Sequence, residues 1–143
     1  MSELKLAQYP EVAELLSVLE QSGLRKEQDE VKSLVSYIDE METRLSAMNE
    51  KLTQMHREIS TIRDSTLKAR CEKLISGAEK HLQQMKTAVM TVKDNFVRAA
   101  TNAVSAFKDK GKESLRRALT AMRIPALLET LKGGFDRGAE NAR

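Results

Sequence analysis

The most reactive side chains in this sequence are those of His56, His81 and Cys71, its only histidines and its only cysteine. Catalysis would need one of them to be activated, oriented by a partner and shielded from water. Both histidines flank apolar rows of heptad spacing, as exposed residues do. Cys71 lies on such a row, where a small apolar residue packs. We therefore expect structural or solvent-exposed roles for all three, and no enzymatic activity.

A metal or phosphate site is not indicated either. One cysteine and two histidines separated by 25 residues match no zinc-ligand spacing. The pair Gly133-Gly134 lacks the strand-to-helix context and the following Lys-Ser/Thr of a phosphate-binding loop. The acidic residues Asp39, Glu40 and Glu42 lie on a predicted helix that turns most of them outward. The sequence predicts no catalytic residue, no metal ion and no cofactor.

The helix that carries these residues is indicated by ten apolar positions spaced alternately by three and four. This 3.5-residue period is typical of a left-handed coiled coil, whereas a strand would alternate with period two. Such a helix must bury its apolar edge against another helix. The ten positions are Val31, Leu34, Ile38, Met41, Leu45, Met48, Leu52, Met55, Ile59 and Ile62. We predict an oligomer seam formed by Leu45, Met48, Leu52, Met55 and Ile59.

A second apolar series of the same spacing runs from Cys71 to Ala106, but its phase is shifted by two residues. A continuous coiled coil absorbs insertions of three or four residues. The shift therefore favours a break near Arg63–Thr66, where Asp64, Ser65 and Thr66 are all competent N-caps. A rival break lies at Ser76–Glu79, which resembles a capping box. We expect helices over 26–63 and 66–108 that pair as an antiparallel hairpin, with one long bent helix as the alternative.

The predicted fold class is all-α: a long antiparallel helical hairpin or coiled coil with a short N-terminal helix and short C-terminal helices. Pro10 begins the first helix and Ser22-Gly23 ends it. The expected divisions are 1–24 for that helix, 25–110 for the hairpin, 111–135 for the short C-terminal helices and 136–143 for a flexible tail. Gly133-Gly134 is expected to close the last helix.

Composition favours an extended helical protein, with 3% aromatic and 31% charged residues among 143. The lone cysteine and the acidic N-terminus suggest a cytoplasmic protein, and no apolar stretch is long enough to span a membrane. Residues 1–64 contain 8 Lys and Arg against 13 Asp and Glu, whereas residues 65–143 contain 16 against 8. The densest basic run is the predicted partner-binding cluster of Lys108, Lys110, Lys112, Arg116, Arg117 and Arg123.

Three segments carry a resemblance to a known family: Val12–Leu24, Leu34–Glu42 and Ala103–Gly111. Together they resemble an uncharacterised family of coiled-coil proteins that conjugative and related mobile elements of gut Firmicutes carry. The resemblance extends over roughly residues 10–135. It implies no catalytic residues, and it implies a small protein that acts on transfer machinery or on host defence.

Two classes of function follow. In the first, the chain is a non-catalytic module that binds proteins, forms a homodimer and modulates or inhibits a nucleic-acid-handling complex, in the manner of an anti-CRISPR. In the second, the basic C-terminal half binds DNA or RNA as an accessory of conjugative transfer. That function would favour exposed aromatic residues for stacking, whereas Phe96 and Phe107 fall on the apolar stripe. A third interpretation, in which the C-terminal pieces lie on a membrane surface, is opposed by their scattered acidic residues.

Overall fold

The computed structural model describes the backbone of residues 5–141 and the side chains of residues 5–134. Within these ranges every regular element is helical, which confirms the predicted all-α fold. A 3₁₀ helix at Leu6–Gln8 precedes five α-helices: α1 (Pro10–Gln21), α2 (Arg25–Ile59), α3 (Ser65–Lys110), α4 (Lys112–Met122) and α5 (Ile124–Asn141).

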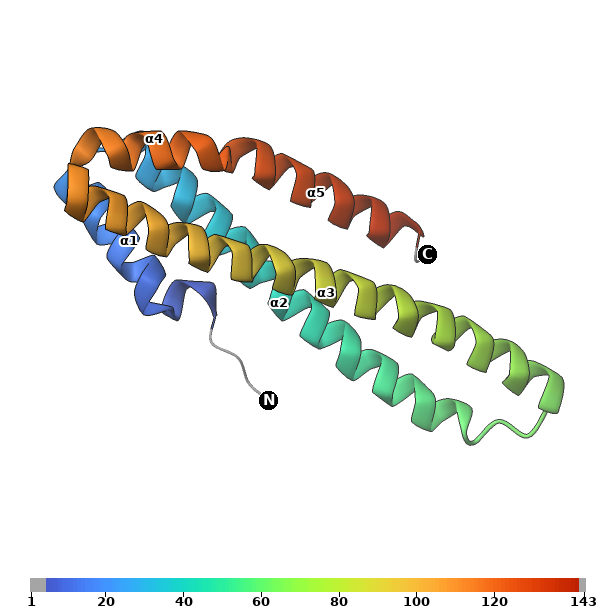
Figure 1. Cartoon of the computed structure of the whole chain (residues 1–143). Coiled ribbons are helices and arrows are strands. Elements are labelled where there is room, and N and C mark those ends of the chain that lie inside the picture. Colours follow the sequence, from blue (N-terminus) through green and yellow to red (C-terminus); the bar gives the residue numbers. More distant parts are fainter. Residues whose placement is uncertain (1–4, 142–143) are drawn as a thin grey trace.

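Helices α2 and α3 form the long antiparallel hairpin of Figure 1. They contain 35 and 46 residues, or about 52 and 69 Å at the α-helical rise. The break falls where the phase shift predicted it, because the Asp64 carboxylate accepts hydrogen bonds from the backbone amides of Thr66 and Leu67, both at 3.0 Å. The rival break at Ser76–Glu79 is wrong, since these residues lie inside α3, and so is the single continuous helix.

The hydrophobic core lies away from the hairpin tip, which we define as the turn at residues 60–64 with the adjoining turns of α2 and α3. Leu15 and Leu19 of α1, Leu34 and Ile38 of α2, and Leu115 of α4 are fully buried there. Helices α1 and α5 lie on opposite sides of the hairpin, and α5 ends well before the tip (Figure 1). Most of the hairpin is therefore flanked by other helices, whereas in the described part of the chain no further helix flanks α2 and α3 at the tip.

Residues of positive φ separate three pairs of successive helices. Gly23, at φ +72°, separates α1 from α2, and Gly111, at φ +89°, separates α3 from α4. Arg123 adopts the left-handed conformation at φ 50° between α4 and α5, where an L side chain is strained.

The N-terminal segment is held onto α2 by polar contacts. The Asp39 carboxylate accepts hydrogen bonds from the backbone amides of Leu6 at 2.7 Å and Ala7 at 3.2 Å. Lys5 donates to the Thr43 hydroxyl at 2.7 Å. These bonds position Leu6, which is fully buried.

The predicted end of the last helix at Gly133-Gly134 is wrong, because α5 continues through both glycines to Asn141. A glycine inside a helix costs about 1 kcal/mol, which does not forbid it. The packing of Leu128 and Leu131 against the core opposes that cost. Residues 136–141 of the predicted tail are thus helical, and residues 142–143 lie outside the described residues.

Candidate functional site

The structure divides the predicted oligomer seam into two parts. Leu45 and Ile59 are 3% and 8% exposed, because α3 of the same chain covers the edge of α2 on which they lie. Met48 and Leu52 are half-buried, and Met55 is 42% exposed. Only these last three residues remain at the surface, so any contact with a second molecule through this seam must involve them.

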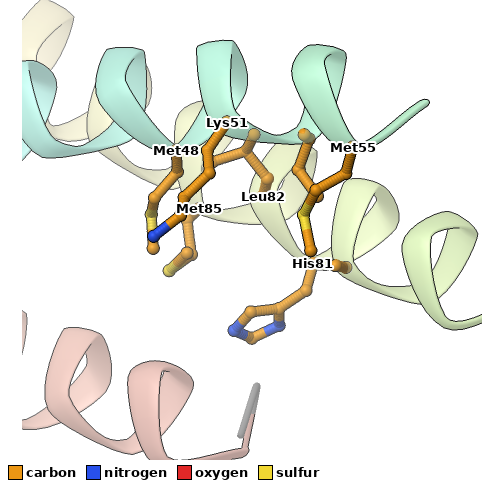
Figure 2. Close-up of a pocket in the computed structure, with 8 residues that line it drawn as sticks. Met48, Lys51, Met55, His81, Leu82 and Met85 are labelled. Carbon is orange, nitrogen blue, oxygen red and sulfur yellow. The ribbon is translucent and has the colours of Figure 1, made fainter. Parts of the chain in front are cut away.

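A hollow of about 140 Å³ opens between α2 and α3 beside these three residues. Met48, Leu52 and Met55 line it from α2, and Ala78, His81, Leu82 and Met85 line it from α3. Figure 2 shows the methionine side chains gathered between the two helices, with Lys51 extending beside Met48 and Met85. The hollow is almost wholly apolar, and Lys51 contributes its only permanent charge.

Exposed leucines extend this apolar surface towards the turn. Leu67 and Leu74 are 49% and 74% exposed. Leu67, Leu74, His81 and Ala88 follow one another at intervals of seven residues, which places them in one row along α3. Nearer the core, Leu131 and Gly134 of α5 line a second hollow together with Ala88. Helix α5 therefore covers one end of the row and ends before the other.

The two histidines have different environments. His56 Nε2 lies 2.9 Å from Glu79 Oε2, and this pair joins α2 to α3 with both side chains about half exposed. His81 lines the apolar hollow, and its Nε2 is buried with no hydrogen-bond partner among the described residues. Cys71 is a partly buried free thiol. Among the described residues, no group of three His, Cys, Asp or Glu side chains is arranged to hold a metal ion.

The predicted basic cluster gathers on the last turn of α3 and on α4. Lys108 pairs with Glu14 of α1 at 3.2 Å, and Arg116 pairs with Glu113 at 3.5 Å, all of these side chains being exposed. The other four are exposed and make no ion pair with a described residue; they are Lys110, Lys112, Arg117 and Arg123. Arg123 lies at the opposite end of α4 from Lys112, so the cluster is an extended surface rather than a pocket.

The sequence reasoning missed a buried charge. Lys93 is 2% exposed and donates both to Glu42 Oε1 at 3.2 Å and to Glu42 Oε2 at 3.1 Å, with the Glu42 side chain 21% exposed. Its ammonium also lies 5.2 Å from the centroid of the Tyr9 ring. A signal was present, because Lys93 interrupts a helical row that includes the buried residues Val89 and Phe96. This centre joins the N-terminal segment, α2 and α3.

Fold and surface together define an all-α hairpin protein with an apolar tip and a basic surface on α3 and α4. The chain belongs to the family of unknown function DUF6674, whose model matches residues 8–143. A search of curated proteins found no match, and a search of solved structures found none. In residues 5–141, no helix is both long and apolar enough to cross a bilayer.

Proposed function

We propose that this protein is a non-catalytic, cytoplasmic helical module that works by binding other proteins. The observation that carries the proposal is the apolar surface at the hairpin tip, where Met55, Leu67 and Leu74 are 42%, 49% and 74% exposed. Exposed apolar side chains beside an apolar hollow are typical of protein–protein contacts. Methionines in such a surface can repack against the partner.

The resemblance to coiled-coil proteins of conjugative elements supplies the proposed setting. In that setting the protein modulates or inhibits a nucleic-acid-handling complex, for example a CRISPR effector of the host defence. Inhibition by occupation requires only a rigid scaffold and complementary surfaces, which a long helical hairpin provides. The predicted homodimer would compete for the same apolar surface, because its seam residues Met48, Leu52 and Met55 line the hollow beside the tip.

Direct binding of DNA or RNA is a second candidate function. Lys110 and Arg117 line a shallow hollow between α3 and α4 together with Ser105 and Ser114. Cationic and hydroxyl groups are the side chains that most often contact nucleic-acid phosphates. Asp109 lines the same hollow and opposes an anion there. Because this acidic side chain lies among the cations, we place nucleic-acid binding second to protein binding.

The proposal is tested by cross-linking the protein to its partners in native host cells and identifying them by mass spectrometry. The purified partner is then titrated with two variants, Leu74→Glu at the tip and the triple variant Lys110→Glu/Lys112→Glu/Arg117→Glu on the basic surface. We expect at least one variant to lose binding while helicity is unchanged. Full binding by both variants would contradict both surfaces.

Salt distinguishes the second candidate. Duplex DNA binding through the basic surface should weaken by orders of magnitude between about 50 and about 200 mM salt, because counterions are released from the phosphates. Protein docking with an apolar centre should weaken less. Fluorescence anisotropy with a labelled DNA duplex measures this directly.

A further inference from the structure

We propose that the tip binds an acid-flanked amphipathic helix of a partner protein, laid along the hairpin as an end-to-end continuation of α5. This inference rests on the proposed function and names the chemistry of the partner. It concerns the tip face, which we define as Met48, Lys51 and Met55 of α2 with Leu67, Leu74, His81 and Met85 of α3.

The tip face continues a surface on which a helix is already seated. Met85 lines both the apolar hollow of the tip and the neighbouring hollow under α5, where Leu131 and Gly134 of α5 lie. The row that includes Ala88 passes from the part covered by α5 to His81 and then to the exposed Leu74. A helix placed beyond the end of α5 therefore meets the same groove between α2 and α3 that α5 occupies nearer the core (Figure 1).

The size of the exposed row defines the occupant. Leu67 and His81 are 14 residues apart on α3, which corresponds to about 21 Å and four helical turns. Four turns bury an amphipathic stripe with anchors at helical spacing, as in other helix-in-groove complexes. The expected occupant is thus a helix of about four turns.

The charges around the row favour an acidic helix. Lys51 lies one turn before Met55 on α2, and Arg70 lies one turn before Leu74 on α3. Both cations are exposed, and neither pairs with a described acidic residue. Glu58 is the acidic side chain on the same side of α2. Lys51 and Arg70 outnumber Glu58, so the edge of the tip face is positively charged. Acidic residues on either side of the partner helix's apolar stripe would complement that charge.

The chain itself contains an example of this mode of docking. Helix α1 carries Glu11, Glu14 and Glu20 and no Lys or Arg, and it packs its apolar side against both hairpin helices. Its Glu14 pairs with Lys108 at the rim of that contact. The hairpin therefore already accepts one acidic amphipathic helix on the side opposite α5.

The test uses the full chain and a synthetic peptide with the sequence of residues 9–24, which is an acidic amphipathic helix. A second peptide carries Glu11→Lys, Glu14→Lys and Glu20→Lys. Binding is followed through the ¹³C-methyl NMR signals of the methionines. Met90 is the internal control, because it is 46% exposed but lies nine residues, or two and a half turns, beyond His81 and so faces away from the tip face.

We expect the acidic peptide to shift the signals of Met48, Met55 and Met85, to leave Met90 unchanged and to bind at least about tenfold more tightly than the basic peptide. Leu74→Glu should weaken binding by about tenfold or more, because it places a carboxylate in the apolar contact. The matched variant Met90→Glu should change binding less than about twofold. Lys51→Glu/Arg70→Glu should reverse the preference between the peptides.

Three results would overturn the inference. Equal binding of both peptides would show that the tip face does not select acidic helices. A shift confined to Met90 would place the binding site on the opposite face of α3. Shifts of Met55 and Met85 that follow protein concentration without peptide, with a doubled mass in light scattering, would assign the tip face to a second copy of the chain. The proposed function is tested by cross-linking to a native partner, and none of these peptide results changes the outcome of that experiment.

Discussion

The buried Lys93–Glu42 pair gives the sharpest test of how this fold is stabilised. The informative changes are Glu42→Met and Lys93→Met, because methionine is close in length to both side chains and has a good helix propensity. Each single variant removes the ion pair and keeps one of its two charges. The double variant removes both charges.

The expected magnitudes follow from the unequal burial of the two residues. Lys93 is 2% exposed, so Glu42→Met removes a carboxylate from an ammonium that water cannot reach and should lower the free energy of unfolding by about 3–5 kcal/mol. Glu42 is 21% exposed, so Lys93→Met leaves a carboxylate that can turn to solvent, at a cost of about 1–2 kcal/mol. The double variant buries two apolar side chains instead and should lie within about 1 kcal/mol of the wild type.

The assay is urea unfolding at pH 7, followed by circular dichroism at the helical minimum, with the midpoints compared at constant m-value. The matched control is Glu40→Met, since Glu40 pairs with Arg44 at 3.0 Å while both side chains are 58% exposed. It should cost no more than about 0.5 kcal/mol. The reasoning is refuted if Glu42→Met costs no more than Glu40→Met, or if the effects of the single variants simply add in the double variant.

Three further changes test local features of the fold. Asp64→Ala removes the N-cap of α3 and should lower the unfolding free energy by about 1 kcal/mol in the same urea assay. Arg123→Gly relieves the strain of an L side chain in the left-handed conformation between α4 and α5. Glycine also raises the entropy of the unfolded chain, so the net gain in unfolding free energy should be about 0.5 kcal/mol and the thermal midpoint should rise. A lower midpoint would contradict this. Asp39→Ala frees the backbone amides of Leu6 and Ala7, so hydrogen exchange at both should accelerate at least about tenfold while α3 stays protected.

The hairpin was predictable because its determinants are local. The heptad row of α2 requires a covering helix, and a two-residue phase shift cannot be absorbed within a continuous coiled coil. The shift therefore favoured a break between the two rows, and Asp64 caps α3 there. Spacing and capping act within a few residues, so the sequence alone carries them.

The end of α5 and the buried Lys93 were not predictable in the same way. Gly133-Gly134 resembles a helix end, but α5 lies against α2 and α3, and this packing outweighs a weak local preference. Lysines are usually solvated, so the residue type by itself does not predict that Lys93 is buried. It is buried because Glu42 and Tyr9, 51 and 84 residues away, meet it in space. Contacts at such separations leave only an indirect mark on the local pattern, namely a lysine that interrupts the apolar row of Val89 and Phe96.

The sequence predicted the apolar row that forms the candidate site, but not which residues of that row are exposed. Leu45 and Met55 occupy the same apolar row with the same spacing, yet they are 3% and 42% exposed. A heptad row states that a helix must be covered, but it does not state how many helices lie alongside it at each turn. That number falls towards the tip because α5 ends short of it (Figure 1). Ile59 is nearer the tip than Met55 but only 8% exposed, because α3 covers its edge of α2. The lengths of the flanking helices and the edge of α2 on which a residue lies therefore decide together where the buried seam becomes an exposed apolar surface.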